Sequence, residues 1–135
     1  MTVKAFAVRV VVALAILAAG WVWGASGKAA VDQARRATEA QLHYARARAG
    51  ILDGRLTLVG NEYANAAALF AQAQTELETL QRMLREVGRA ELGGQIEIVL
   101  SHVRRARDAA AAGNANAWTA ADAALQALKG IVLPE

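Results

Sequence analysis

The sequence predicts an all-α protein, with an N-terminal transmembrane helix followed by an antiparallel four-helix bundle or two stacked helical hairpins. Three observations support this. Residues 10–25 contain no charged side chain. Beyond them, apolar residues recur at alternating steps of three and four, which places them on one helical face, whereas a strand has a period of two. Alanine supplies 34 of the 135 residues and the single proline is Pro134, a composition that favours helices over sheets.

Residues 1–25 are predicted to be a membrane anchor. A bilayer core of about 30 Å needs roughly 20 helical residues. Residues 5–25 supply that length if the guanidinium of Arg9 extends to the membrane surface. Trp21 and Trp23 stand at the far end, where indole rings favour the headgroup region.

The same segment also fits a secretory signal, with Lys4 and Arg9 as its positive end and residues 25–27 as a small-residue cleavage site. The tryptophans just before that site argue for an uncleaved segment. A short lysine-containing lead favours a cytoplasmic N-terminus, and the alanine content and excess of arginine over lysine indicate a bacterial gene. We therefore expect a single pass of the bacterial inner membrane with the helical domain, residues 26–135, in the periplasm.

The first helix of that domain is expected over residues 28–59, continuing from the anchor with a break or bend near Gly24 and Gly27. Its apolar spacing predicts one core-facing stripe. The stripe consists of Leu42, Ala45, Ala49, Leu52, Leu56 and Val59.

Three further helices are expected over residues 62–87, 90–112 and 115–129. Their ends are marked by glycine, a residue type that often ends helices. These glycines are Gly60, Gly88, Gly113 and Gly130. Short connections make neighbouring helices antiparallel. The predicted core stripes are Tyr63, Ala66, Phe70, Ala73, Leu77, Leu80, Leu84 and Val87; Leu92, Ile96, Val99, Val103, Ala106 and Ala110; and Trp118, Ala121, Leu125 and Leu128.

A local pattern in the second helix runs Tyr63-x-x-Ala66-x-x-x-Phe70-x-x-Ala73, and Gly54 precedes it. Over residues 54–73 this resembles a tetratricopeptide-repeat hairpin, although the 34-residue period of that family does not continue along the chain. The resemblance implies a helical hairpin of similar packing with a peptide-binding groove.

Basic residues are predicted to gather near the membrane surface. If the second helix returns antiparallel, its last turns reach the level where the first leaves the bilayer, and such a collar would hold anionic lipid headgroups. The alternative is a solvated face with local salt bridges to acidic neighbours. The collar consists of Lys28, Arg35, Arg36, Arg82, Arg85 and Arg89.

The favoured function is a non-catalytic interaction or scaffold subunit of a membrane-associated complex, with a protein partner or further copies of itself. No motif for catalysis, a cofactor or a metal is recognisable, and cysteine is absent. Residues 26–135 carry 13 basic and 12 acidic groups, which argues against nucleic-acid binding. In the anchor, Gly20 and Gly24 form a small-x-x-x-small surface for another transmembrane helix.

Two other functions remain open. A lipid-sensing or small-ligand carrier would bind its ligand in a gap of the alanine-rich seam beside Tyr63, Phe70 and Trp118. A haem- or metal-binding bundle would use His43 and His102, which are more simply interpreted as rim histidines.

Overall fold

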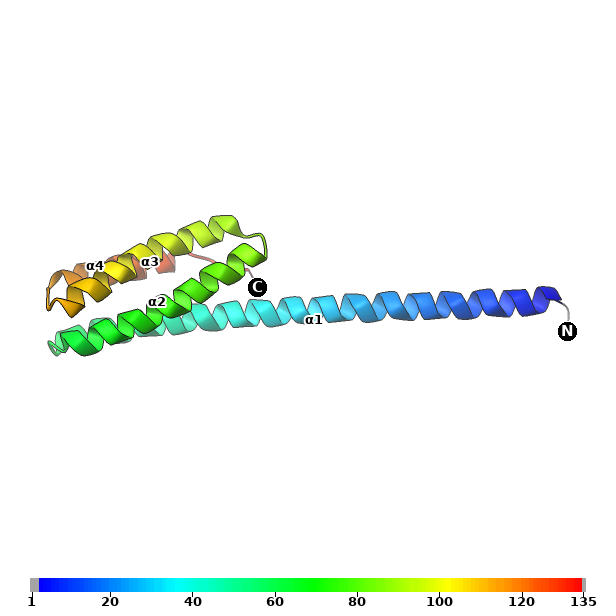
Figure 1. Ribbon diagram of the computed structural model, residues 1–135, viewed down its shortest axis with the longest axis horizontal. Helices are drawn as coiled ribbons and strands as arrows, with labels where there is room; N and C mark the ends of the chain where they lie inside the picture. The colour runs from blue at the N-terminus through cyan, green and yellow to red at the C-terminus, as the bar shows by residue number, and fades with distance from the viewer. Residues whose placement is uncertain (1–2, 135) are drawn as a thin grey trace. The chain divides into compact units, whose positions relative to one another are not determined.

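The computed structural model describes residues 3–134, with side chains for residues 11–21, 24 and 27–134. The described helices are α1 (Val3–Val59), α2 (Tyr63–Glu86), α3 (Ala90–Ala111) and α4 (Asn116–Lys129) (Figure 1). No strand occurs in this range, which confirms the prediction of an all-α protein. The bounds of α2 to α4 agree with the expected ranges to within one residue at each end.

Helix α1 differs from expectation at its start. It is one continuous helix from Val3 onward, so the break expected near Gly24 and Gly27 is absent. An isolated glycine costs only about 1 kcal/mol relative to alanine in a helix, and the alanine-rich neighbours favour the helical state. Contacts divide the chain into two units, Met1–Arg36 and Ala37–Glu135.

The predicted membrane anchor finds no support in the described part of the chain. There, none of the helices has a stretch both long enough and apolar enough to cross a bilayer. The side chains of residues 1–10, 22, 23, 25 and 26, which belong to the predicted anchor or adjoin it, lie outside that description.

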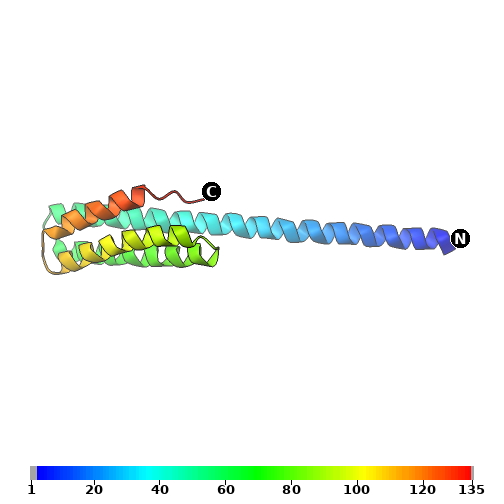
Figure 2. The same ribbon diagram turned by 90° about the horizontal axis from the view of Figure 1, so that it is seen from above.

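The unit Ala37–Glu135 is an antiparallel helical bundle. Helix α3 packs against both α2 and α4. The C-terminal half of α1 closes the ring: Gly50 lies against Ala73 of α2, and the hydroxyl of Tyr44 donates a 2.9 Å hydrogen bond to the carbonyl oxygen of Leu128 on α4. Figures 1 and 2 both show successive helices running in opposite directions.

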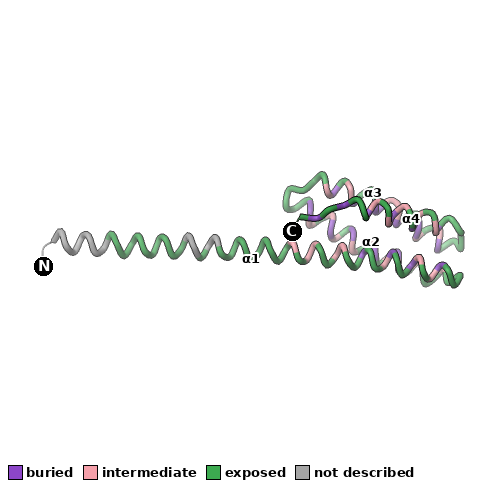
Figure 3. The backbone as a smooth tube through the Cα atoms, turned by 180° about the vertical axis from the view of Figure 1, so that it is seen from behind, coloured by how far each residue is buried: buried purple, intermediate pink, exposed green. Residues whose placement is uncertain are grey.

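The bundle core is continuous and apolar. Figure 3 shows the buried positions on the inward faces of the helices, and Ile131 and Leu133 extend the core beyond α4. Each large side chain contributes about 1.5–3 kcal/mol by leaving water, before the conformational entropy that folding costs. The largest fully buried side chains are Phe70, Ile51, Leu58, Leu77, Leu80, Ile96, Leu100, Leu128, Val99 and Val103.

The three turns between the helices share one hydrogen-bonding pattern. After α2, the amide of Arg89 donates to the carbonyl of Leu84 at 2.8 Å and the amide of Gly88 to Arg85 at 3.1 Å. This is a Schellman motif, which places one residue in the left-handed conformation. In the three turns, taken in chain order, that residue is Asn61 with φ of 58°, Gly88 with φ of 77° and Gly113 with φ of 66°. In the first turn the residue with positive φ is therefore the asparagine and not Gly60.

The core stripes predicted for α2, α3 and α4 are largely buried. The stripe predicted for α1 is exposed, so that prediction is wrong. Helix α1 directs Ala47, Ile51 and Leu58 into the core, two positions out of phase with the predicted stripe. Leu52 and Leu56 are exposed instead. Both sets have the same three-and-four spacing, and packing against α2 and α4 decides between them.

Candidate functional site

The exposed apolar stripe of α1 is the most distinctive surface of the bundle. Leu42, Leu52, Leu56 and Val59 keep 46%, 38%, 68% and 64% of their residue surface exposed. We call this surface the outer stripe. It consists of Leu42, Ala45, Ala49, Leu52, Leu56 and Val59, all of them exposed.

The outer stripe lies on the side of α1 opposite the core. At 3.6 residues per turn, Ala49 and Leu56 are turned about half a revolution from Ala47 and Leu58, which face inward. A surface helix of a bundle ordinarily has polar residues there. Helix α1 is therefore apolar on two opposite faces, and only one of them is covered by its own bundle.

Charged side chains separate the two apolar faces. Arg46 and Asp53 lie along the flank next to α2, and Arg48 and Arg55 lie along the other flank. Arg55 is held by its own bundle: its Nε lies 2.6 Å from Asp122 Oδ1, and its guanidinium lies 5.5 Å from the ring centre of Trp118. Arg48 and Asp53 are exposed, and no side-chain ion pair involves either of them among the described residues.

Large exposed apolar residues are scattered elsewhere in this unit. Val87 follows α2, Ile98 lies on α3 and Val132 lies in the tail. Scattered residues of this kind are normal on soluble surfaces, whereas a contiguous apolar patch marks an interaction site. The outer stripe is such a patch, since its six residues follow one another along a single helical face.

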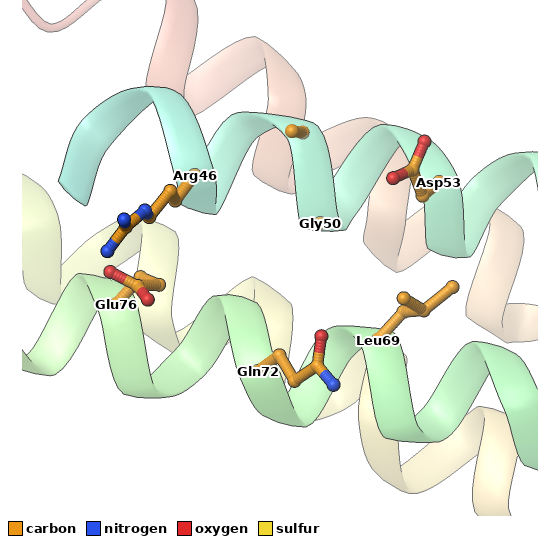
Figure 4. Close-up of a pocket in the computed structure, with 7 residues that line it drawn as sticks. Arg46, Gly50, Asp53, Leu69, Gln72 and Glu76 are labelled. Carbon is orange, nitrogen blue, oxygen red and sulfur yellow. The ribbon is translucent and has the colours of Figure 1, made fainter. Parts of the chain in front are cut away.

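A groove of about 270 Å³ runs between α1 and α2 on one flank of the outer stripe (Figure 4). The side chain of Arg46 is directed toward the Glu76 carboxylate in this view, and Asp53 lies farther along the same helix. Four of its seven lining residues are polar or charged, and its volume lies below the roughly 300–1,000 Å³ of ordinary ligand pockets, so the groove does not resemble an apolar ligand site. Its lining residues are Arg46, Ala49, Gly50, Asp53, Leu69, Gln72 and Glu76.

The two histidines lie on different helices. Nδ1 of His43 on α1 lies 2.5 Å from Oε2 of Glu76 on α2. His102 is half-buried on α3. Within the described residues, no group of three or more histidine, cysteine or acidic side chains is arranged to hold a metal.

The aromatic residues predicted to line a pocket take other positions. Phe70 is completely buried, and its ring occupies the space beside Gly54. Tyr63 and Trp118 are half-buried at the edge of the core. None of these three lines the groove between α1 and α2, so the predicted ligand pocket remains a prediction.

The predicted basic collar is divided between the two units. Lys28, Arg35 and Arg36 are exposed in the first unit, and Arg82, Arg85 and Arg89 are exposed around the turn between α2 and α3. The aliphatic stem of Arg85 also packs over Gly93, where an added Cβ would lie 3.2 Å from its Cγ. The lipid contacts of the collar stay a prediction.

The predicted packing surface in the first unit is open. A Cβ added at Gly20 or Gly24 would meet no atom within 4 Å, so both positions have space for a neighbouring helix. Whether a second transmembrane helix packs there stays a prediction.

A polar network joins α2 to α3 on another face of the bundle. Gln81 donates a 2.8 Å hydrogen bond to Glu97, and Arg104 donates one of 3.0 Å to the same carboxylate. These two hydrogen bonds, the one from Gln81 foremost, lower the pKa of Glu97 from its ordinary value of 4.5. The network is a stabilising feature of the α2–α3 pair.

Comparison of the chain with protein-family models, with curated proteins and with solved structures finds no match. The outer stripe is thus interpreted from its own geometry. The three-and-four spacing placed the residues of the outer stripe in the core, so the stripe was not predicted as a surface. The sequence did contain one signal for the true core face of α1. Gly50 and Gly54 lie on that side of the helix, and their small size permits another helix to approach closely.

Proposed function

We propose that this protein is a non-catalytic interaction subunit, held in the bacterial inner membrane by residues 1–25, whose periplasmic helical bundle binds a protein helix along the outer stripe. The observation that carries the proposal is the contiguous apolar face of α1 that its own bundle leaves uncovered.

The anchor rests on the uncharged run of residues 10–25. Its described apolar side chains are directed around the whole circumference of α1, and more than half the surface of each is exposed. A helix that is apolar all round needs lipid or protein around it. The exposed residues are Val11, Val12, Leu14, Ile16, Leu17 and Trp21.

The choice of a protein helix as ligand rests on the shape of the outer stripe. The small residues Ala45 and Ala49 are followed along the stripe by the large residues Leu52 and Leu56. Helices pack by placing the side chains of one between those of the other, and small residues let the two axes approach closely. A narrow apolar stripe between charged flanks is the pattern of a helix–helix seam.

Alkaline extraction of membranes from cells producing the full chain tests the anchor. We expect the protein to stay in the membrane pellet, and the double variant Leu14→Arg/Leu17→Arg to be released, because a charge at the bilayer centre costs about 2.5–3.5 kcal/mol. Complete extraction of the wild-type chain would contradict the anchor. A C-terminal alkaline phosphatase fusion, active only in the periplasm, tests the orientation.

Photo-crosslinking in those membranes tests the binding surface. A benzoylphenylalanine at Leu52 should give a protein adduct, whereas one at Ala68, an exposed position on α2, should give none. Equal labelling from both positions would contradict the assignment of the outer stripe as the binding surface.

A further inference from the structure

We infer that the helix covering the outer stripe is α1 of a second copy of this chain, running parallel to the first. The inference rests on the proposed function for the location of the stripe and for the shared membrane, and it adds the identity and direction of the partner.

The spacing of the outer stripe is that of a two-stranded coiled coil. Leu42, Ala49 and Leu56 are seven residues apart, and so are Ala45, Leu52 and Val59. These two series correspond to the a and d positions of a heptad, whose side chains insert between those of an identical facing helix. A self-complementary face of this kind suits a two-fold symmetric dimer.

The charges beside the stripe complement each other between parallel copies. In this register Arg48 is a g position and Asp53 is the following e position, the pair that meets across a parallel seam. Two-fold symmetry forms the Arg48–Asp53 pair twice. Within one copy these side chains are five residues apart and make no ion pair with each other or with any other described residue, so both are available to a second copy.

The antiparallel alternative is less favourable. A seam centred between Ala49 and Leu52 would bring Arg48 opposite Arg55 of the other copy twice. The attraction of Arg46 for Asp53, which would also meet twice in that seam, is offset by this repulsion, whereas the parallel seam has the attractive Arg48–Asp53 pairs without an opposing one. Arg55 already contacts Asp122 and the Trp118 ring. If the Arg55 side chain moved to avoid Arg48 of the other copy, these two contacts inside the bundle would be lost. Two copies inserted in one membrane with the same orientation also have parallel α1 helices.

Burial within the bundle leaves the seam accessible. The residues that pack against α2 and α4 lie on the opposite side of α1, among them Tyr44, Ala47 and Ile51. The dimer therefore requires no rearrangement of the core. Dimerisation would bury an apolar face that is exposed to water in one copy. A charged substitution on this face would leave the folded monomer intact.

Disulfide crosslinking of the full chain in membranes tests the inference, because the sequence has no cysteine of its own. Single substitutions Leu42→Cys, Leu52→Cys and Val59→Cys are oxidised and compared with the control Ala68→Cys on α2. In a parallel dimer each stripe residue lies next to its own counterpart, so all three stripe variants should form a covalent dimer and the control should not.

The two end positions distinguish the directions. Leu42 and Val59 are separated by 17 residues, about 26 Å of helix, and in an antiparallel seam Leu42 would lie beside Val59 of the other copy. Crosslinking only when Leu42→Cys and Val59→Cys chains are mixed would overturn the parallel arrangement.

Failure of the inference is separable from failure of the proposed function. If the cysteine variants give no dimer while the photo-crosslinker at Leu52 captures a different protein, the second copy is excluded and the interaction surface stands. If neither probe gives an adduct, both proposals fall. Circular dichroism melts of each variant confirm that the bundle is folded.

Discussion

The ring of Phe70 occupies the space that glycine leaves at Gly54: a Cβ built on Gly54 would lie 2.6 Å from Cε1 of that ring. Both residues are buried, so the ring has little room to move aside. This contact fixes how closely α1 and α2 approach and which face of α1 enters the core.

Gly54→Ala should therefore destabilise the bundle by about 1–3 kcal/mol, the usual cost of overpacking. For a domain of this size that is a fall of roughly 4–8 °C in Tm for each kcal/mol. Gly94→Ala is the matched control, since Gly94 is in helix α3 with nothing within 4 Å of an added Cβ. It should stabilise by about 0.5–1 kcal/mol. Equal melting of the two variants would contradict the packing at Gly54.

A second substitution tests whether the ring itself causes that cost. Phe70→Ala should destabilise by about 3–5 kcal/mol because it leaves a cavity. Phe70→Leu removes ring atoms from the neighbourhood of Gly54 and should reduce the penalty of Gly54→Ala, so the double variant should be less destabilised than the sum of the two singles. Strict additivity in urea unfolding would show that the two sites are independent.

Neighbouring residues on α1 test the assignment of its two faces. Ile51 is completely buried and Leu52 belongs to the outer stripe. Ile51→Ala should cost about 2–5 kcal/mol, whereas Leu52→Ala should change the unfolding free energy of the dilute monomer by less than about 0.5 kcal/mol. A larger loss from Leu52→Ala than from Ile51→Ala would return the outer stripe to the core.

Glu97 should give the bundle a small acid-dependent stability. Its pKa is lowered by hydrogen bonds from Gln81 and Arg104, so the unfolded chain takes up this proton first as the pH falls. The contribution is present above the ordinary pKa of 4.5 and disappears as the pH falls through the lower folded value. Glu97 is about half exposed, so the effect should not exceed about 0.5 kcal/mol. Thermal melts of Glu97→Gln should lie below wild type at pH 7 and coincide with it near pH 3; an unchanged gap at pH 3 would count against this origin.

Turn chemistry made the last three helices predictable. Gly88 and Gly113 have the positive φ that their residue type indicates, and Asn61 takes the same conformation in the first turn. Because each turn ends a helix within a residue or two, the turn residues predicted the ranges of α2, α3 and α4, and the apolar spacing within those ranges predicted their core faces.

Helix α1 could not be predicted in the same way. Its two apolar series have equal spacing, and the one with larger side chains is the exposed one. The buried series contains Ala47 and Gly54, whose small size looks unfavourable for a core until Phe70 is placed beside it. Which face is buried thus depends on a long-range contact with α2, and the candidate interaction surface emerged only once that contact was known.

The pairing of Arg48 with Asp53 of a second copy is tested most directly by exchanging the charges. Arg48→Glu and Asp53→Lys each place like charges opposite one another twice in a dimer of identical chains, while a dimer of one chain of each kind has attractive pairs at both places. The two variants are produced together and extracted gently from membranes, and native mass spectrometry counts the species. We predict more mixed dimer than random pairing gives and little of either homodimer. A random mixture, or monomers alone where the wild-type chain is also monomeric, would contradict the parallel α1 dimer.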